Sequence, residues 1–315
     1  MAKNDLVVLA IGGNSLIMDP QHKTVDDQYH SCEITCGYIA KMLEEGYRVV
    51  ITHGNGPQVG FILRRSELAA SELHLVPLDS CVADTQGAIG YHIQRAMGNA
   101  MEGHEKRTPV ATVVTQVLVD ADDPAFKNPT KPIGTFMDAK LAQSRQQDYG
   151  WDVVEDSGRG FRRVVASPIP KAIIELDAIR ALVDGGFVVV AAGGGGIPVV
   201  NKGGVLDGAE AVIDKDLASS MLAMELGADL LLISTAVEKA YVNFGQPDQR
   251  GLDRVTVAEA RQYIEDGYFA PGSMLPKIKA VLEFVEATGN DALITDPQNM
   301  LRGLAGETGT RIVAK

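Results

Sequence analysis

The feature of this 315-residue sequence that most constrains its fold is a repeated order of short apolar run, glycine loop and helical stretch. The run at residues 6–11 ends in Gly-Gly-Asn, and the run at 47–52 ends in His-Gly-Asn-Gly-Pro. Continuous apolar runs of this length are typical of strands buried on both faces of a sheet. Further runs lie at 110–119, 187–192, 230–234 and 292–295, with helical stretches between them. We therefore predict an α/β fold, a mostly parallel sheet covered by helices on both faces.

Two further segments complete the expected organisation. Residues 28–45 show helical spacing of apolar positions, and Gly46 is expected to end that helix. Residues 120–165 interrupt the alternation with several aspartates and prolines, and their aromatic residues predict a small inserted subdomain that packs. We expect a single domain over 1–315, with an N-terminal lobe at about 1–200 that holds the insertion and a C-terminal lobe at about 201–315.

Composition excludes several classes of protein. The net charge of −12, without a stripe of lysine and arginine, argues against a nucleic-acid partner. No apolar stretch approaches the roughly 20 residues that span a bilayer, and residues 1–5 do not begin a signal peptide, so we expect a cytoplasmic protein without a membrane partner. The cysteines number three, which makes a disulfide framework improbable. Cys32 and Cys36 fit packing better than metal binding.

Glycine loops after strands are the first candidate site. A glycine there lets backbone N–H groups face an anion, and the helix that follows adds the positive end of its dipole. The candidates are Gly12, Gly13 and Asn14, then Gly54 and Asn55, then Gly194 and Gly195 in a run of four glycines. Tight turns alone remain an alternative for each loop taken singly. The sequence has neither G-x-x-x-x-G-K-S/T nor G-x-G-x-x-G, which argues against P-loop, protein-kinase and dinucleotide sites.

Lysines beside turns are the second candidate. Lys131, Lys215 and Lys277 are framed by proline, aspartate or apolar neighbours, and Lys215 lies between Asp214 and Asp216. Lysine ammonium groups stabilise the oxygens of a phosphoryl group during its transfer, and a neighbouring carboxylate orients them. Solvated surface positions remain the alternative for each lysine alone. His53 is expected to bond to its loop backbone without moving a proton.

These motifs occur in an order that resembles a known family. The matching blocks are Gly12-Gly13-Asn14, residues 53–60, residues 131–134, residues 158–160, residues 193–198, residues 211–217 and residues 269–274. The chain resembles the carbamate kinases of the amino acid kinase family from about residue 5 to residue 313. The resemblance implies a three-layer αβα sandwich with a small protruding subdomain that carries Lys131. It also implies a homodimer, and Mg²⁺ bound with the nucleotide and not by a protein metal site.

The resemblance assigns roles to particular residues. Lys131, Lys215 and Lys277 would act on the transferring group, and Asp216 would hold the lysines. The glycine loops would bind carbamate or carbamoyl phosphate in the N-terminal lobe. ATP or ADP would bind in the C-terminal lobe, at Asp214, Ser234, Thr235, Ala236, Val237, Tyr241, Ala270, Pro271, Gly272, Ser273 and Met274. Ser15 and residues 135–137 depart from the commonest family pattern, and these positions flank the substrate half.

The expected reaction is reversible, direct in-line phosphoryl transfer, ATP + carbamate = ADP + carbamoyl phosphate. We expect the reaction to run toward ATP synthesis, because carbamoyl phosphate is a mixed anhydride. Arginine breakdown and purine or allantoin breakdown both fit as pathways. Two alternatives stay open. One is another small-molecule kinase of the same fold, and the other is a noncatalytic nucleotide sensor.

Overall fold

The computed structural model describes residues 4–12, 24–104, 107–155, 158 and 160–315. The strands are β1 (Leu6–Ile11), β2 (Arg48–His53), β3 (Val110–Thr112), β4 (Gln116–Val119), β5 (Lys131–Met137), β6 (Asp152–Glu155), β7 (Phe161–Val165), β8 (Pro170–Ile173), β9 (Val188–Val190), β10 (Ile197–Lys202), β11 (Val205–Gly208), β12 (Leu230–Ser234), β13 (Tyr241–Val242), β14 (Arg250–Gly251), β15 (Arg254–Thr256), β16 (Ala292–Thr295) and β17 (Thr310–Val313). The α-helices are α1 (Val25–Glu44), α2 (Gly56–Leu68), α3 (Leu78–Ala100), α4 (Ala139–Tyr149), α5 (Leu176–Asp184), α6 (Lys215–Leu226), α7 (Val257–Glu265), α8 (Met274–Thr288) and α9 (Met300–Leu304). Short 3₁₀ helices are η2 (Pro124–Phe126), η3 (Gly193–Gly195) and η4 (Pro297–Asn299).

The main sheet orders its strands as β15-β17-β16-β12-β1-β2-β9-β3. Its central strands run parallel, with Leu9 of β1 opposite Leu232 of β12 and Ile51 of β2. Only the β16–β17 pair among the described pairs of this sheet is antiparallel. The predicted mostly parallel sheet is confirmed, and four of its strands, β12, β1, β2 and β9, lie side by side with their carboxyl ends at one edge.

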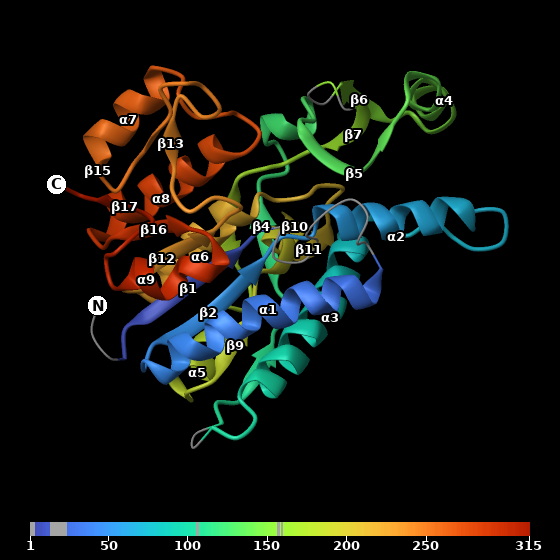
Figure 1. Ribbon diagram of the computed structural model, residues 1–315. Helices are drawn as coiled ribbons and strands as arrows, with labels where there is room; N and C mark the ends of the chain where they lie inside the picture. Colours follow the sequence, from blue (N-terminus) through green and yellow to red (C-terminus); the bar gives the residue numbers. More distant parts are fainter. Residues whose placement is uncertain (1–3, 13–23, 105–106, 156–157, 159) are drawn as a thin grey trace.

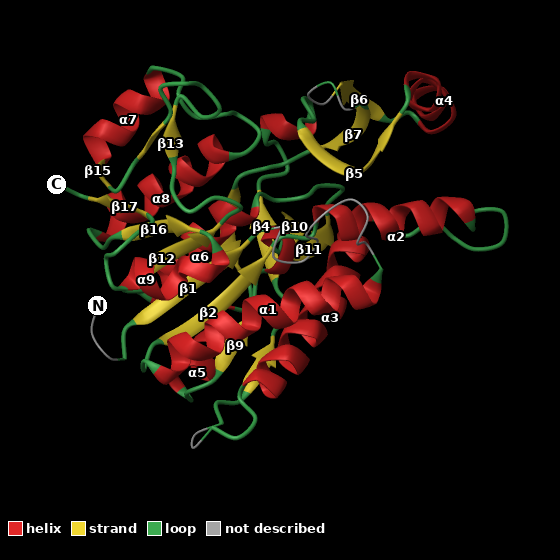
Figure 2. Ribbon diagram, in the orientation of Figure 1, coloured by secondary structure: helices red, strands yellow, loops and turns green. Residues whose placement is uncertain are grey.

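Helices cover both faces of this sheet, as Figures 1 and 2 show. Alternate residues of β1 separate two cores, because side chains along a strand point to opposite faces. Val8 packs on one face with residues of α5, α6, α7 and α8. Leu9 packs on the other with residues of α1, α3 and α9. The three-layer αβα arrangement is therefore confirmed, and α1 ends at the predicted stop, where Gly46 adopts φ 92°.

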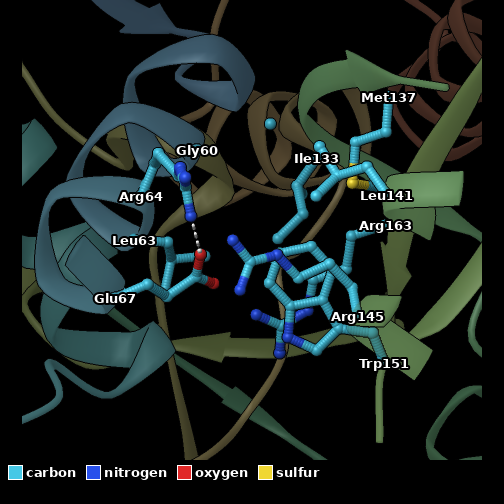
Figure 3. A pocket seen from close by; sticks show the side chains of 11 residues that line it. Gly60, Leu63, Arg64, Glu67, Ile133, Met137, Leu141, Arg145, Trp151 and Arg163 are labelled. Carbon is cyan, nitrogen blue, oxygen red and sulfur yellow. Dashed lines mark hydrogen bonds and ion pairs between the residues drawn. The ribbon is translucent and has the colours of Figure 1, made fainter. Parts of the chain in front are cut away.

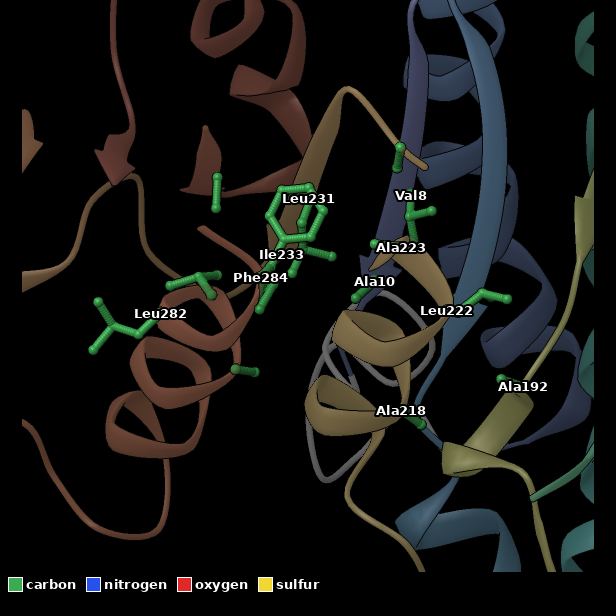
Figure 4. Close-up of a cluster of buried hydrophobic side chains, with 14 of the residues drawn as sticks. Val8, Ala10, Ala192, Ala218, Leu222, Ala223, Leu231, Ile233, Leu282 and Phe284 are labelled. Carbon is green, nitrogen blue, oxygen red and sulfur yellow. The ribbon is translucent and has the colours of Figure 1, made fainter. Parts of the chain in front are cut away.

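Small residues let α6 lie close to the sheet. Ala10 on β1 belongs to the same buried cluster as Ala218 and Ala223 on α6, and all three are fully buried (Figure 4). The helix is also tied to β2 by a 2.5 Å hydrogen bond between the hydroxyls of Thr52 and Ser219. This close packing brings the start of α6 to the carboxyl edge of the sheet.

The expected single strand at 110–119 is wrong. Residues 110–112 form β3 at the edge of the main sheet, and residues 116–119 form β4 in a second sheet of order β11-β10-β4-β8. Thr115 separates the two, because its backbone N–H bonds to the Gln86 side chain and its hydroxyl donates to Val113 O and accepts from Ala192 N–H. These bonds replace the pairing that a continuous strand would need.

The insertion folds as a small unit of its own. Strands β5, β7 and β6 form an antiparallel sheet, with α4 beside it, and the unit projects from the main body (Figure 1). Its base packs on α2 and α3 through Ile133 and Val165, which join Val59 and Cys81 in a third apolar cluster. Across the described ranges, none of the helices combines the length and apolar character that a membrane span requires.

Candidate active site at the carboxyl edge of the sheet

Four neighbouring parallel strands deliver their following loops to one cavity of about 390 Å³. Gly12 follows β1, Gly54 and Asn55 follow β2, Gly194 follows β9, and Thr235 follows β12, and all five line the cavity. Ligands of open α/β sheets bind beyond the carboxyl ends of the strands, where backbone groups and helix starts are available. The position of this cavity is therefore that of a ligand site.

Three helices begin at the cavity wall. The first residue of α2 is Gly56, the first of α6 is Lys215, and Ser273 precedes the first residue of α8. The first N–H groups of a helix have no partners within the helix, and the helix dipole places partial positive charge there. Three helix starts around one cavity favour an anionic ligand such as a phosphate.

A network of lysines and aspartates closes one side of the cavity. Lys215 and Lys277 both donate to the carboxylate of Asp216, and the Lys277 Nζ to Asp216 Oδ2 distance is 2.9 Å. Lys131 reaches across from the subdomain, and its Nζ lies 2.5 Å from Asp214 Oδ2. Asp214 also caps α6 by accepting from the Asp216 N–H at 2.9 Å. Three ammonium groups from distant stretches of the chain thus meet around adjacent aspartates.

Burial and charge work against each other in this network. Burial by itself raises the pKa of Asp216, but the ammonium groups of Lys215 and Lys277 outweigh it and hold that pKa far below its usual value. The pKa of Asp214 is lowered in the same way, since Lys131 outweighs burial. Burial lowers the pKa of Lys215, and the Asp216 carboxylate opposes that shift. Asp216 therefore contributes most to favouring the charged form of Lys215, and the Asp214 carboxylate adds to it.

The glycine loop after β9 has a conformation that side chains would not tolerate. A Cβ on Gly194, whose φ is 69°, would lie 2.0 Å from the Asn55 Nδ2 atom. The preceding Ala192 adopts φ 48°, a strained left-handed conformation for alanine. Gln86 of α3 holds this turn, because its side-chain nitrogen donates to Gly193 O at 2.9 Å. The two loops of β2 and β9 are in direct contact, so glycine here serves close approach as well as turning.

His53 lies under the same loops and is completely buried. Its Nδ1–H donates to Gly54 O at 3.1 Å, which agrees with the expected backbone bond. Burial, with a further contribution from the Lys215 charge, lowers the pKa of His53 to about 4. The imidazole is therefore neutral near pH 7.

A second cavity of about 510 Å³ adjoins the first, and the two share Thr235, Ala236 and Ser273 as lining residues. Its remaining lining residues are Val237, Tyr241, Asn243, Phe244, Gly267, Tyr268, Ala270 and Met274. Tyr241 and Phe244 lie with ring centroids 5.8 Å apart, and Phe244 is 63% exposed. An exposed aromatic wall beside a polar cavity suits a flat heterocyclic ring.

The structure brings most of the predicted site residues together. Lys131, Lys215, Asp216, Lys277, Gly12, Gly54, Asn55, Gly194, Asp214, Ser234, Thr235, Ala236, Gly272 and Ser273 line the first cavity, and Val237, Tyr241, Ala270 and Met274 line the second. Gly195 and Pro271 line neither: Gly195 is buried against the Ile213 backbone, and Pro271 is exposed in the turn before α8. Gly13 and Asn14 lie outside the described residues.

Sequence reasoning missed several lining residues. Gly56, Pro132, Ile133, Val212, Ile213 and Pro276 line the first cavity, and Asn243, Phe244, Gly267 and Tyr268 line the second. Gly56, Pro132 and Ile133 lie inside blocks that were already singled out as motifs. Phe244 and Tyr268 stand in segments without a motif, and only the fold brings them beside Tyr241.

Comparison with known proteins agrees with this geometry. The family model described as the amino acid kinase family matches residues 5–296. The carbamate kinase-like protein YahI of Escherichia coli is 50% identical over 313 residues, covering 98% of this chain and 99% of that protein. The carbamate kinase of Clostridium perfringens is 48% identical over 311 residues, covering 98% of this chain and 99% of that protein. The structure of carbamate kinase from Giardia lamblia bound to AMP-PNP superimposes with a TM-score of 0.92 at 41% identity, with 100% of both chains covered.

The chain belongs to the amino acid kinase family, and it is an enzyme of the kinase class. Within that family, the expected resemblance to the carbamate kinases is confirmed by relatives of that name along nearly the whole chain.

Proposed function

We propose that this protein is a carbamate kinase, which catalyses ATP + carbamate = ADP + carbamoyl phosphate. The observation that carries the proposal is the meeting of Lys131, Lys215 and Lys277 at one cavity beneath glycine loops and helix starts. Phosphoryl transfer needs positive charge around the moving group and little covalent help from the protein. The carbamate kinases among the relatives support the choice of carbamate as the acceptor.

The proposed mechanism is direct in-line transfer. Carbamate is already an anion, so no side chain has to remove a proton from it. Lys215 and Lys277 would lie against the transferring phosphoryl oxygens, and Asp216 would hold both lysines in position and favour the charged form of Lys215. Backbone N–H groups of the loops at Gly12, Gly54 and Gly194 would stabilise the charge that develops. Gly13 and Asn14, which follow Gly12, would bind on the same side.

The two ligands would divide the cavities between them. We place the nucleotide's phosphates in the first cavity beside Asp214, Ser234 and the turn at 270–274, and its adenosine in the second cavity beside Tyr241. Carbamate or the carbamoyl group would lie toward Lys131 and Asn55, on the side built by the N-terminal lobe. This division corresponds to lobes at about 1–200 and 201–315.

Mg²⁺ would enter with the nucleotide and take its ligands from phosphate oxygens and water, where it neutralises phosphate charge. Asp214 is the cavity carboxylate that would contact its water shell, because Asp214 keeps 18% exposure while Asp216 keeps 5%. We further propose a cytoplasmic homodimer that works toward ATP synthesis, in arginine breakdown or in purine or allantoin breakdown. The mixed anhydride of carbamoyl phosphate makes that direction favourable.

The test is a luciferase assay for ATP after mixing the protein with ADP, Mg²⁺ and carbamoyl phosphate, against a blank without protein. We expect ATP to form, and the Lys215→Ala variant to lose most of the rate. Binding of ADP without ATP formation would identify a noncatalytic nucleotide sensor. ATP formation only with acetylglutamyl or aspartyl phosphate in place of carbamoyl phosphate would identify a different kinase of this fold.

A further inference from the structure

Lys131 is the one proposed catalytic lysine that comes from the protruding subdomain, so its placement depends on how that subdomain docks. We propose that the backbone contact between Gly60 on α2 and Gly134 on β5 positions Lys131 over the reaction site, which makes Gly60 a positioning residue for the carbamate side. That the positioned Lys131 serves the carbamate side of the site rests on the proposed function. The contact between Gly60 and Gly134 does not rest on it.

The contact is too close for any side chain at residue 60. A Cβ built on Gly60 would lie 2.1 Å from Gly134 Cα and 2.7 Å from Gly134 N, distances that real Cβ atoms do not reach. The obstructing atoms are backbone atoms, which cannot rotate aside as a side chain can. An alanine at residue 60 must therefore push β5 and α2 apart.

The contact is asymmetric. A Cβ built on Gly134 would meet Gly60 Cα at 3.7 Å, an ordinary van der Waals distance. Gly134 has its own requirement, because its φ of 70° is disfavoured for other residues. Residue 60 thus sets the spacing between the two elements, and residue 134 sets the path of the strand at the contact.

A rigid strand connects this contact to the lysine. Lys131, Pro132 and Ile133 pair with residues of β7 immediately before Gly134. Ile133 is 2% exposed and packs in the apolar cluster that contains Val59, the neighbour of Gly60. Because the strand is paired and its base is packed, a shift at Gly134 moves Lys131, whose Nζ now lies 2.5 Å from Asp214 Oδ2. A displacement near 1 Å in a reacting group can change rate by about a hundredfold.

The interface between α2 and the subdomain contains Trp151, whose fluorescence can report on their spacing. A cavity of about 60 Å³ lies between α2 and the subdomain and is lined by Gly60, Gly134 and Trp151 among others (Figure 3). Trp151 is the single tryptophan of the sequence. The guanidinium groups of Arg163 and Arg145 lie 4.8 Å and 5.7 Å from its ring centroid. Its fluorescence should therefore respond when the spacing between α2 and the subdomain changes.

The experiment compares Gly60→Ala with Gly87→Ala. Gly87 is a helical glycine of α3 with nothing within 4 Å of an added Cβ, so it controls for the glycine-to-alanine change itself. We expect Gly60→Ala to lower kcat/KM for carbamoyl phosphate about tenfold to a hundredfold, to leave KM for ADP near the wild-type value, and to shift Trp151 emission. Gly87→Ala should change none of these.

A second comparison asks whether the effect passes through the lysine. In a Lys131→Met background, adding Gly60→Ala should reduce kcat/KM by less than about twofold, because coupled residues are not additive. The proposal is overturned if Gly60→Ala reduces kcat/KM by the same factor in the Lys131→Met background as in the wild type. It is also overturned if Gly60→Ala and Gly87→Ala have the same kinetics. If Gly60→Ala does not fold, Gly134→Ala takes its place with the same expected dependence on Lys131. Should wild-type protein form no ATP, the proposed function fails, and the Trp151 emission of Gly60→Ala still decides whether the contact sets the docking.

Discussion

Replacing Asp216 by asparagine should weaken the fold and suppress phosphoryl transfer together. The carboxylate is 5% exposed and contacts Lys215 and Lys277, whose side chains are 12% and 15% exposed. Asparagine has nearly the same shape but no charge, so the variant leaves two ammonium groups buried without this counter-ion.

The magnitude follows from the geometry. At 2.9 Å and an effective dielectric of about 20, the contact with Lys277 alone corresponds to roughly 6 kcal/mol of Coulomb attraction. Desolvation offsets part of this, and removing one partner of a buried ion pair costs about 3–5 kcal/mol of stability. For a chain of 315 residues, that loss corresponds to a fall in Tm of about 5–8 °C.

Activity should fall for a related reason. Burial already lowers the pKa of Lys215, and Asp216 opposes that shift. Without the carboxylate the pKa of Lys215 falls further, so the loss of activity at high pH should begin nearer to neutral pH. Loss of preorganised charge at the transferring group should reduce kcat by about 10²–10³-fold.

The assay measures ATP formation from ADP and carbamoyl phosphate across pH, together with thermal unfolding by circular dichroism. The matched control is Asp207→Asn, which breaks a 2.6 Å contact with Lys202 on the surface, where the side chains are 66% and 55% exposed. The control should change neither property, since exposed pairs contribute little. The reasoning is refuted if Asp216→Asn keeps the wild-type turnover, the wild-type Tm and the wild-type pH at which activity is lost on the alkaline side.

Three further predictions concern other parts of the site. Lys131→Met should raise KM for carbamoyl phosphate at least about tenfold while KM for ADP stays near wild type; equal effects on both constants would contradict the division of the cavities. Phe244→Ala should raise the Kd for ADP several-fold through the loss of about 1 kcal/mol or more of ring stacking. Isothermal titration with ADP measures this Kd, and an unchanged value would place the adenine elsewhere. Burial lowers the pKa of His53 from 6.5 to about 4, so the protein should lose stability as pH falls between these two values, because the unfolded state binds the proton that the buried ring rejects. The loss should reach roughly 3 kcal/mol and should be complete below the lower pKa. Urea unfolding at pH 7 and pH 4.5 measures this, and the pH dependence should shrink in His53→Gln; an equal dependence would assign it to other groups.

Local sequence patterns determined the elements and the loops. The runs at 6–11 and 47–52 became β1 and β2, and Gly46 ended α1, because strand burial and helix termination depend on near neighbours. Each of the three predicted glycine loops places a described residue at the cavity, Gly12, Gly54 and Gly194, for the same reason, since each loop follows its own strand. The lysine and aspartate segments were recognisable because each stands inside a short motif.

The tertiary structure alone decided which of these segments meet. The order β12-β1-β2-β9 brings together loops that are distant in the chain, and Lys131 reaches Asp214 across 83 positions. The break at Thr115 depends on Gln86, 29 positions away in an ordinary helical stretch, so no local pattern could separate β3 from β4. The contact of Gly60 with Gly134 could not be predicted either, because the sequence does not distinguish a glycine that forms a turn from one that allows another backbone segment to pack closely. Local propensity shapes each element, whereas strand order and close packing are long-range choices that exist only once the chain has folded.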